Sequence, residues 1–119
     1  MFKQENFFMP SLKFETSAVL SKAQEQALAL EIGNLASAML NKPLSVVQVR
    51  VESGVTVAFC GEITQDSAFL CIALIGAIAP EVKKELPAKF AEVFAKYGIN
   101  SKRLFLNYQE TEPAAWGWL

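Results

Sequence analysis

The feature that most constrains the fold of this chain is a strand–helix–strand pattern that occurs twice. The first copy covers residues 11–51 and the second covers residues 68–108. A strand, a helix and a strand in this order form a βαβ unit, whose two strands are parallel. Two such units predict an α+β fold, in which a single four-stranded mixed sheet carries both helices on one face.

The first copy contains clear signals for the limits of its elements. Apolar residues alternate with charged residues over 11–17, which predicts a strand with one solvated face. Ser21 is a suitable N-cap for a helix over 22–40, which has a wide apolar face and ends before Pro43. Alternating valines then predict a second strand over 46–51.

The second copy follows a short predicted strand over 56–60. The run over 68–75 is almost wholly apolar, which is typical of a central strand that is covered on both faces. A helix is predicted over 81–97 and a last strand over 103–108. Because proline lacks an N–H and clashes with the preceding turn, Pro87 requires the helix either to start or to kink there.

Composition and topology both indicate an oligomer. A chain of 119 residues corresponds to one domain, yet 52 % of its residues are hydrophobic and its mean hydropathy is +0.25. With both helices on one face, the other face of an apolar sheet needs a cover. Another subunit would supply that cover, so we expect a homo-oligomer.

The charge balance argues against two classes of partner. The net charge is −1, from 11 basic and 12 acidic residues, which favours neither nucleic acid nor an anionic membrane. The longest apolar run, 69–80, is shorter than the roughly 20 residues that cross a membrane. Residues 1–8 lack the apolar core of a signal peptide, so we expect a cytoplasmic location.

Two residue types bound the chemistry. The sequence contains no histidine, which excludes a Cys/His metal site and a histidine-based triad, and we expect no metal. The two cysteines, Cys60 and Cys71, are not spaced as a CxxC redox pair and read most simply as buried thiols.

A Met-Pro pair precedes the first predicted strand. If translation starts at Met9, removal of that methionine leaves Pro10 with a free secondary amine. An amine can act as a general base, whereas the lone pair of an amide nitrogen is delocalised into the carbonyl. We interpret 1–9 as an N-terminal extension or a mis-assigned start and favour Met9 as the natural start; an expression scar and a genuine addition are the alternatives.

Several segments resemble the macrophage migration inhibitory factor (MIF) family of tautomerases. They occur in the family's order and close to its spacing from Pro10 to Trp118, which makes 10–119 a single MIF-like domain. The matching segments are 41–49 (NKPLSVVQV), 59–61 (FCG), 75–78 (IGAI), 99–108 (INSKRLFLNY) and 116–118 (WGW).

The resemblance implies a fold, an assembly and an activity. Family members form homotrimers, in which each subunit contributes a sheet to a closed central barrel. They catalyse keto–enol tautomerisation of aromatic 2-oxo acids such as phenylpyruvate, and isomerisation of dopachrome, without a cofactor. Their catalytic base corresponds to Pro10 as a free N-terminal amine. The family also shows non-classical secretion, which is the alternative to a cytoplasmic location.

The resemblance also assigns roles to individual residues. Lys42 would hold the substrate carboxylate, and both Lys42 and burial would lower the pKa of the Pro10 amine. Ile75 would offer a backbone amide, and Asn107 would come from a neighbouring subunit. From position alone, Lys42 reads equally well as a cation at a helix C-terminus, and Asn107 as an outward strand residue. An apolar slot for an aromatic ring, or else plain core, is expected at Phe105, Trp116 and Trp118.

The sequence departs from the family at several positions. Phe105 and Val46 stand where tyrosines are usual, so weaker preference for polar ring groups is expected. The family's CxxC is missing, and one residue is inserted between Gly61 and Ala68. The usual short tail after Leu119 is also missing, which predicts a less stable trimer.

Two alternatives to a phenylpyruvate-type or dopachrome-type tautomerase follow. One is a binding or cytokine-like signalling protein of the same fold with a vestigial pocket, which retention of residues 1–9 would favour. The other is a ferredoxin-like regulatory module that binds a small ligand at a subunit interface. A trimer would favour the tautomerase or the signalling protein, and a dimer would favour the ferredoxin-like module.

Overall fold

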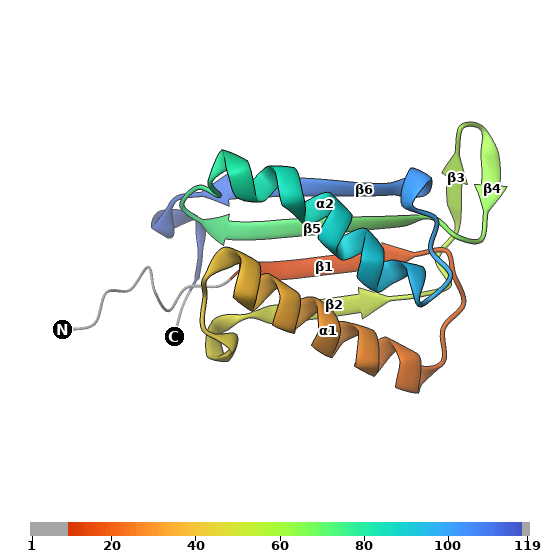
Figure 1. The fold of residues 1–119 in the computed structure, drawn as a ribbon, viewed down its shortest axis with the longest axis horizontal. Coiled ribbons are helices and arrows are strands. Elements are labelled where there is room, and N and C mark those ends of the chain that lie inside the picture. Colours follow the sequence, from red (N-terminus) through yellow and green to blue (C-terminus); the bar gives the residue numbers. More distant parts are fainter. Residues whose placement is uncertain (1–9, 118–119) are drawn as a thin grey trace.

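The structure, a computed structural model, describes residues 10–117. Its elements follow the predicted order, with a short hairpin between the two halves (Figure 1). The main strands and helices are β1 (Pro10–Thr16), α1 (Lys22–Leu40), β2 (Gln48–Glu52), β5 (Ala68–Ile75), α2 (Pro80–Ala95) and β6 (Leu104–Thr111). The hairpin is β3 (Val57–Phe59) and β4 (Glu62–Thr64), and the 3₁₀ turns are η2 (Leu44–Val46), η3 (Ser101–Arg103) and η4 (Pro113–Ala115).

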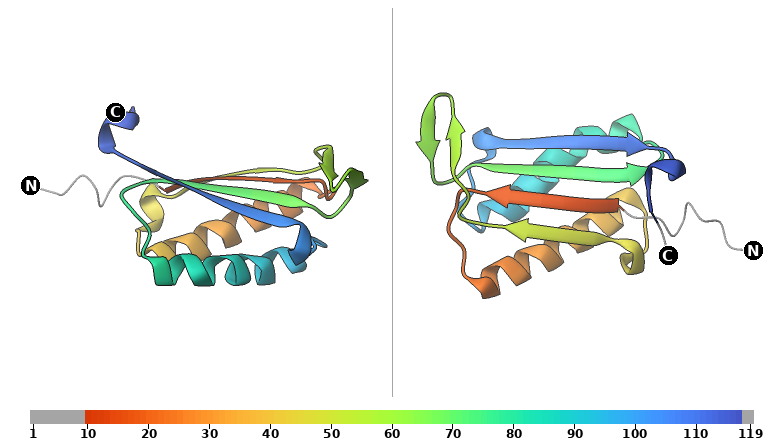
Figure 2. Two further views of the ribbon diagram at one scale, coloured as in Figure 1. Left: turned by 90° about the horizontal axis from the view of Figure 1, so that it is seen from above. Right: turned by 180° about the vertical axis from the view of Figure 1, so that it is seen from behind.

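The four long strands form one mixed sheet in the order β2-β1-β5-β6. β1 is parallel to β2 and β5 is parallel to β6, whereas β1 and β5 are antiparallel. Both helices cover the same face of this sheet, and the opposite face is open (Figure 2). The two predicted βαβ units and their shared sheet are therefore confirmed.

The core lies between the helices and the covered face of the sheet. Every second residue of β1 and β5 points into it, as the two-residue period of a strand requires. Phe14 of β1 contacts Phe94 of α2 with ring centroids 4.5 Å apart, and Phe90 stacks on Phe94 at 5.7 Å. The fully buried side chains include Leu12, Phe14, Leu28, Ile32, Leu70, Ile72, Leu86, Phe90 and Phe94.

Helix α1 begins and ends at residues that satisfy its free backbone groups. The Ser21 hydroxyl accepts a hydrogen bond from the Gln24 N–H, and the Gln24 side chain accepts one from the Ser21 N–H. At the other end, Asn41 takes the left-handed conformation, with φ of 54°. The limits predicted for this helix are confirmed.

Helix α2 begins at Pro80 and continues through Pro87 to Ala95, so it does not start at Pro87. Proline at position 80 costs no hydrogen bond, because the first N–H groups of a helix have no partner within it. Pro87 cannot donate to the carbonyl of Lys83, one turn earlier. The Tyr108 hydroxyl, from β6, donates to that carbonyl instead, at 3.5 Å. The neighbouring strand thus supplies the donor that Pro87 lacks.

The region between the two halves differs most from the prediction. The predicted strand over 46–51 starts later, because the N–H groups of Val46 and Val47 donate within the 3₁₀ turn η2, to Pro43 and Leu44. A strand at β4 was not predicted. It pairs with β3 through a tight turn in which Cys60 and Gly61 both have positive φ, 54° and 80°.

A cluster of buried hydroxyl groups anchors this hairpin to the sheet. Thr64 of β4 shares hydrogen bonds with Ser17 and Ser67, and the Ser67 carbonyl accepts from the Thr16 hydroxyl at 2.7 Å. Because each buried hydroxyl has a partner, none carries the cost of an unpaired polar group. The hairpin is therefore held at the end of the sheet opposite to the start of β1 (Figure 1).

The open face of the sheet is less apolar than expected. Charged and polar side chains of β1 and β2 point outward there, including Lys13, Glu15 and Arg50. Apolar residues of β5 such as Phe69 form a central stripe, and β6 adds Phe105 among polar residues. A mixed surface of this kind suits an interface or a solvated channel better than a dry core.

Within the described range, the structure contains no helix long and apolar enough to cross a membrane. Over residues 10–117 it also contains no group of three or more Cys, Asp or Glu side chains arranged to hold a metal ion.

Candidate active site

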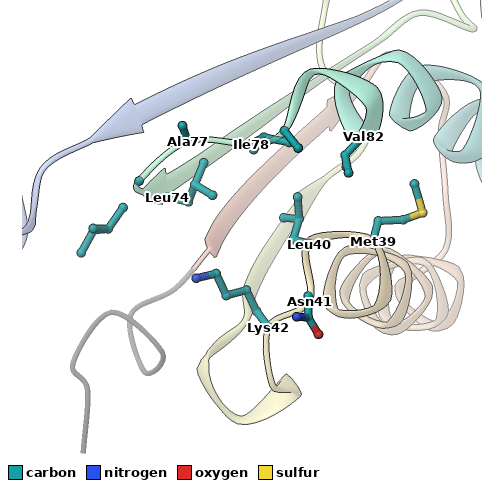
Figure 3. A pocket seen from close by; sticks show the side chains of 11 residues that line it. Met39, Leu40, Asn41, Lys42, Leu74, Ala77, Ile78 and Val82 are labelled. Carbon is teal, nitrogen blue, oxygen red and sulfur yellow. The ribbon is translucent and has the colours of Figure 1, made fainter.

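A cavity lies at the end of the sheet where β1 begins. Its volume is about 390 Å³, and it opens between the C-terminus of α1, the end of β5 and the N-terminus of α2 (Figure 3). Its walls are mainly aliphatic. They come from the covered side of the sheet and from the ends of the two helices that pack on it. The lining residues are Met39, Leu40, Asn41, Lys42, Leu74, Ile75, Gly76, Ala77, Ile78, Ala79 and Val82.

Lys42 supplies the one charged side chain in this lining. Its backbone is fixed from both sides by Ser37, whose carbonyl accepts from the Lys42 N–H at 3.1 Å and whose hydroxyl donates to the Lys42 carbonyl at 2.5 Å. The side chain is half-buried and extends toward the end of the sheet at which β1 begins (Figure 3). The cation therefore lies on a short, well-supported loop at the rim of an apolar cavity.

Pro10 is the first residue of β1 and is fully buried. It is opposite Leu74 of β5 in the antiparallel register, and Leu74 lines the cavity. Pro10 also has the same parity along β1 as Leu12 and Phe14, which point toward the helices. The structure thus brings Pro10, Lys42 and Ile75 together at one end of the sheet, with Pro10 on the covered face and Ile75 at the parity of the open face.

The segment after Ile75 is held by the end of β6. The Gly76 N–H donates to the Thr111 carbonyl at 3.0 Å, and the Glu110 carboxylate accepts from the Ile78 N–H at 2.7 Å. Glu110 also forms an ion pair with Lys83 at 3.0 Å. The hydrogen bond from Ile78, followed by the one from Lys83, holds the pKa of Glu110 below its usual range. One carboxylate therefore anchors both the loop and the first turns of α2 beside the cavity.

Trp116 lies at the same end of the sheet but does not line the cavity. Its indole N–H donates to the Thr111 hydroxyl at 2.6 Å, and that hydroxyl donates to the Leu74 carbonyl at 2.8 Å. The chain beyond β6 is thereby tied to the end of β5. Trp118, the other predicted tryptophan, lies outside the described residues.

Phe105 and Asn107 do not reach this cavity within one chain. Phe105 is opposite Phe69, which is opposite Glu15, so along the sheet it lies five strand positions from Pro10, about 17 Å. Phe105 packs against Phe59 of the hairpin, with ring centroids 5.6 Å apart. The predicted slot of Phe105, Trp116 and Trp118 is not formed by the described part of a single chain, and its assembly from neighbouring subunits stays a prediction.

Asn107 lies on the open face beside Cys71, whose thiol donates to the Asn107 side-chain oxygen at 3.6 Å. Burial raises the pKa of Cys71, against the smaller opposing effects of Arg50 and Lys13. The buried-thiol interpretation therefore fits Cys71, which is partly buried, but is wrong for Cys60, which is exposed in the hairpin turn.

Sequence reasoning missed the residues that form the inner walls of the cavity. In the sequence, Leu40 belongs only to the apolar face of the helix predicted over 22–40, and no pattern distinguishes Met39 or Val82. Their spacing is that of ordinary core residues, and no local signal shows that two helix ends leave a space between them.

Comparison with protein families decides what this arrangement belongs to. The family model described as macrophage migration inhibitory factor (MIF) matches residues 9–119. The chain belongs to the MIF family. The match covers the whole described domain, and with it the ferredoxin-like alternative is removed. The comparison with curated protein sequences gives no match.

Solved structures of MIF proteins share the fold across nearly the whole chain. Leishmania major MIF2 is 24% identical with a TM-score of 0.80, over 93% of this chain and 94% of that one. The MIF-like protein of Entamoeba histolytica is 22% identical with a TM-score of 0.84, over 92% and 95%. A further structure is that of the protein Pt0534 after its inactivation by 2-oxo-3-pentynoate. Pt0534 is 17% identical with a TM-score of 0.80, over 92% of each chain. Likeness at these identities shows the fold alone.

Proposed function

We propose that this MIF-family protein is a tautomerase of the phenylpyruvate or dopachrome type when Pro10 is its free N-terminus. The observation that carries the proposal is the position of Pro10: it is buried at the start of β1, opposite a residue that lines a cavity with Lys42 at its rim. A secondary amine there would be close to a cation and shielded from water. Family membership supports isomerase chemistry in general.

The proposed reaction moves one proton and consumes no other reagent. The neutral Pro10 amine removes a proton from C3 of the 2-oxo acid, and the C3–H electron pair forms the enolate double bond. Lys42 pairs with the carboxylate and stabilises the negative charge that develops on the C2 oxygen. Pro10 then returns the proton to that oxygen, which gives the enol. The aliphatic surroundings of Pro10 disfavour the protonated amine. In this proposal they lower the pKa of the amine, so that more of it is neutral.

We further propose a homotrimer, in which a neighbouring subunit supplies Phe105 and Asn107 to this site. Within one chain Phe105 is 60% exposed and Phe69 is 40% exposed, both on the open face. Large exposed aromatic side chains on one face are typical of surfaces that another molecule covers. The distance of Phe105 from Pro10 along the sheet means that only a second copy could place it beside the amine.

A relative supports the substrate class. Pt0534 is inactivated by 2-oxo-3-pentynoate, an alkyne conjugated to the ketone of a 2-oxo acid. Such a compound accepts nucleophiles, so a free amine that binds 2-oxo acids would add to its triple bond. For this chain, we expect one covalent adduct on Pro10 when Pro10 is the N-terminus and none on that residue when residues 1–9 remain attached.

The test compares protein started at Met9 with protein started at Met1. We expect the first to lose Met9, to interconvert the keto and enol forms of phenylpyruvate and to form the adduct, each followed by intact mass and ultraviolet absorbance. Pro10→Gly should lower kcat/KM by about 100-fold or more, within the range of general-base contributions. Ser11→Gly, at the next position, is the matched control and should retain activity.

One result would favour the signalling alternative. If the Pro10-terminated protein is a folded trimer but neither turns over phenylpyruvate nor forms the adduct, the pocket is vestigial and the tautomerase proposal fails. The chain with residues 1–9 attached carries Pro10 as an amide, so its inactivity alone would not count against the proposal.

A further inference from the structure

The cavity beside Pro10 extends into the helix layer of its own chain. Its inner walls come from the last turn of α1 (Met39 and Leu40), from Ile78, and from the first turn of α2 (Val82). Figure 3 shows Leu40, Ile78 and Val82 directed toward one another, with Lys42 extending toward the start of β1. No aromatic side chain of the described residues lines this space, because Phe105 is at the other end of the sheet and Trp116 is bonded to Thr111.

The lining is chemically uniform. Apart from Asn41 and Lys42 at the rim, all the side chains that line it are aliphatic or thioether, and none is aromatic or acidic. Its volume of about 390 Å³ is within the range of pockets that bind small molecules. Flexible side chains such as Met39 adapt to a chain of methylene groups, which needs no stacking partner. This lining fits a ligand with one anionic end and an unbranched apolar remainder.

Pro10 lies on the same side of the sheet as this space. Because Pro10 and Leu74 share the covered face, a carboxylate at Lys42 would direct the carbons beyond C3 past Leu74 and between the helix ends. The entry from the rim to Val82 thus runs away from the open face, where the neighbouring subunit would contribute its aromatic side chains. A long alkyl chain and an aryl ring would therefore leave the amine in different directions.

We propose that this cavity binds the alkyl chain of unbranched aliphatic 2-oxo acids, with the carboxylate at Lys42. The inference rests on the proposed function for its chemistry, but binding of the alkyl chain does not require a free Pro10 amine. It names a substrate class that differs from the aromatic 2-oxo acids, and it makes chain length the property that the protein selects.

Two measurements on the Pro10-terminated protein test this. The first is deuterium incorporation at C3 of straight-chain 2-oxo acids of increasing length, and of phenylpyruvate, followed by proton NMR. The second is calorimetric binding of saturated straight-chain carboxylates of the same lengths, which have no 2-oxo group to react. We expect kcat/KM and affinity to rise about fourfold per methylene until the cavity is full, as burial of each CH₂ predicts.

A matched pair of variants locates the effect. Val82→Phe fills the cavity from α2 and should remove most of the gain with chain length, whereas Val82→Ala should move the optimum to longer chains. Val93 is also a half-buried valine of α2 packed on the core, but it does not line the cavity. Val93→Phe should therefore leave the length dependence unchanged, even if it lowers stability.

The outcomes separate the two proposals. A flat length dependence in both measurements, or a rise that Val82→Phe and Val82→Ala leave unaltered, would overturn the alkyl-chain inference while phenylpyruvate turnover could still stand. A length-dependent affinity for carboxylates without exchange of any 2-oxo acid would support the alkyl site and contradict the tautomerase.

Discussion

The two ends of the sheet carry cavities that are built in opposite ways. At the Pro10 end, a cavity of about 390 Å³ is lined mainly by aliphatic side chains, with Lys42 at the rim. At the hairpin end, about 300 Å³ lies on the open face against the rings of Phe59, Phe69 and Phe105. The first cavity is made by one chain, whereas the second leaves aromatic rings exposed. This difference is consistent with the two roles proposed above, ligand binding at the first end and a contribution of aromatic side chains to a neighbouring subunit at the second.

An ion pair supports the cavity at each end of the sheet. Arg103 is paired with Asp66 by two hydrogen bonds of 2.8 and 3.0 Å at the hairpin end, where it fixes the start of β6. At the Pro10 end, Glu110 and Lys83 fix a loop that forms a cavity wall. At each end, therefore, a charged pair supports residues that line a cavity: Arg103 itself lines the one at the hairpin end.

The largest expected effect is a loss of activity when the cation at the Pro10 end is removed. Lys42→Met keeps the length of the side chain and removes its charge, so we expect kcat/KM for 2-oxo acids to fall about 100-fold, the scale of losing one charge-stabilising donor. Steady-state kinetics on the Pro10-terminated protein measures this. Lys84→Met, at an exposed position of α2, is the control. Equal kinetics in the two variants would show that Lys42 does not contact the substrate.

An intermediate effect is expected at the hairpin end. Phe105→Ala should weaken subunit association by about 2 kcal/mol, as for a buried aromatic anchor, and should lower activity together with assembly. Light scattering over a dilution series measures the association. Val19→Ala removes a side chain that is even more exposed, at 81%, from the loop between β1 and α1, so it should change neither property. A Phe105→Ala protein that stays fully assembled and active would contradict the division between the two ends.

The smallest expected effect concerns the support of the cavity wall. Because the pKa of Glu110 is lower in the folded protein than in the unfolded chain, its contribution to stability is fully present at neutral pH. That contribution is lost as the pH falls through the lowered pKa. The melting temperature of the unaltered protein should therefore exceed that of Glu110→Gln at pH 7, and the gap should narrow in acid. Glu112→Gln, at a nearby exposed site, should show no such gap; a constant gap for Glu110→Gln would exclude the ionic mechanism.

The sequence predicted the main elements because each is specified by neighbouring residues. The capping box of Ser21 and Gln24 and the αL residue Asn41 set the limits of α1, and the apolar run over 68–75 matched β5 to the residue. Prediction was incomplete where distant groups decide. The sequence left open whether the second helix starts at Pro87, and the structure shows that it continues through this residue, where Tyr108 supplies a donor from β6. Strand β4, which is held by hydroxyls of Ser17 and Ser67, was not predicted.

The candidate site divides along the same line. Local pattern and family resemblance were enough to select Pro10, Lys42 and Ile75 from the sequence, and the structure brings these three to one end of the sheet. Local pattern and resemblance could not show that Phe105 lies at the far end of the sheet. Strand register is set by the pairing between β5 and β6 and not by either strand alone. The inner walls of the cavity, Met39, Leu40 and Val82, likewise exist only where the two helices end side by side. Residue order determined the elements and the chemistry of the rim, whereas long-range packing alone determined the shape of the space behind it.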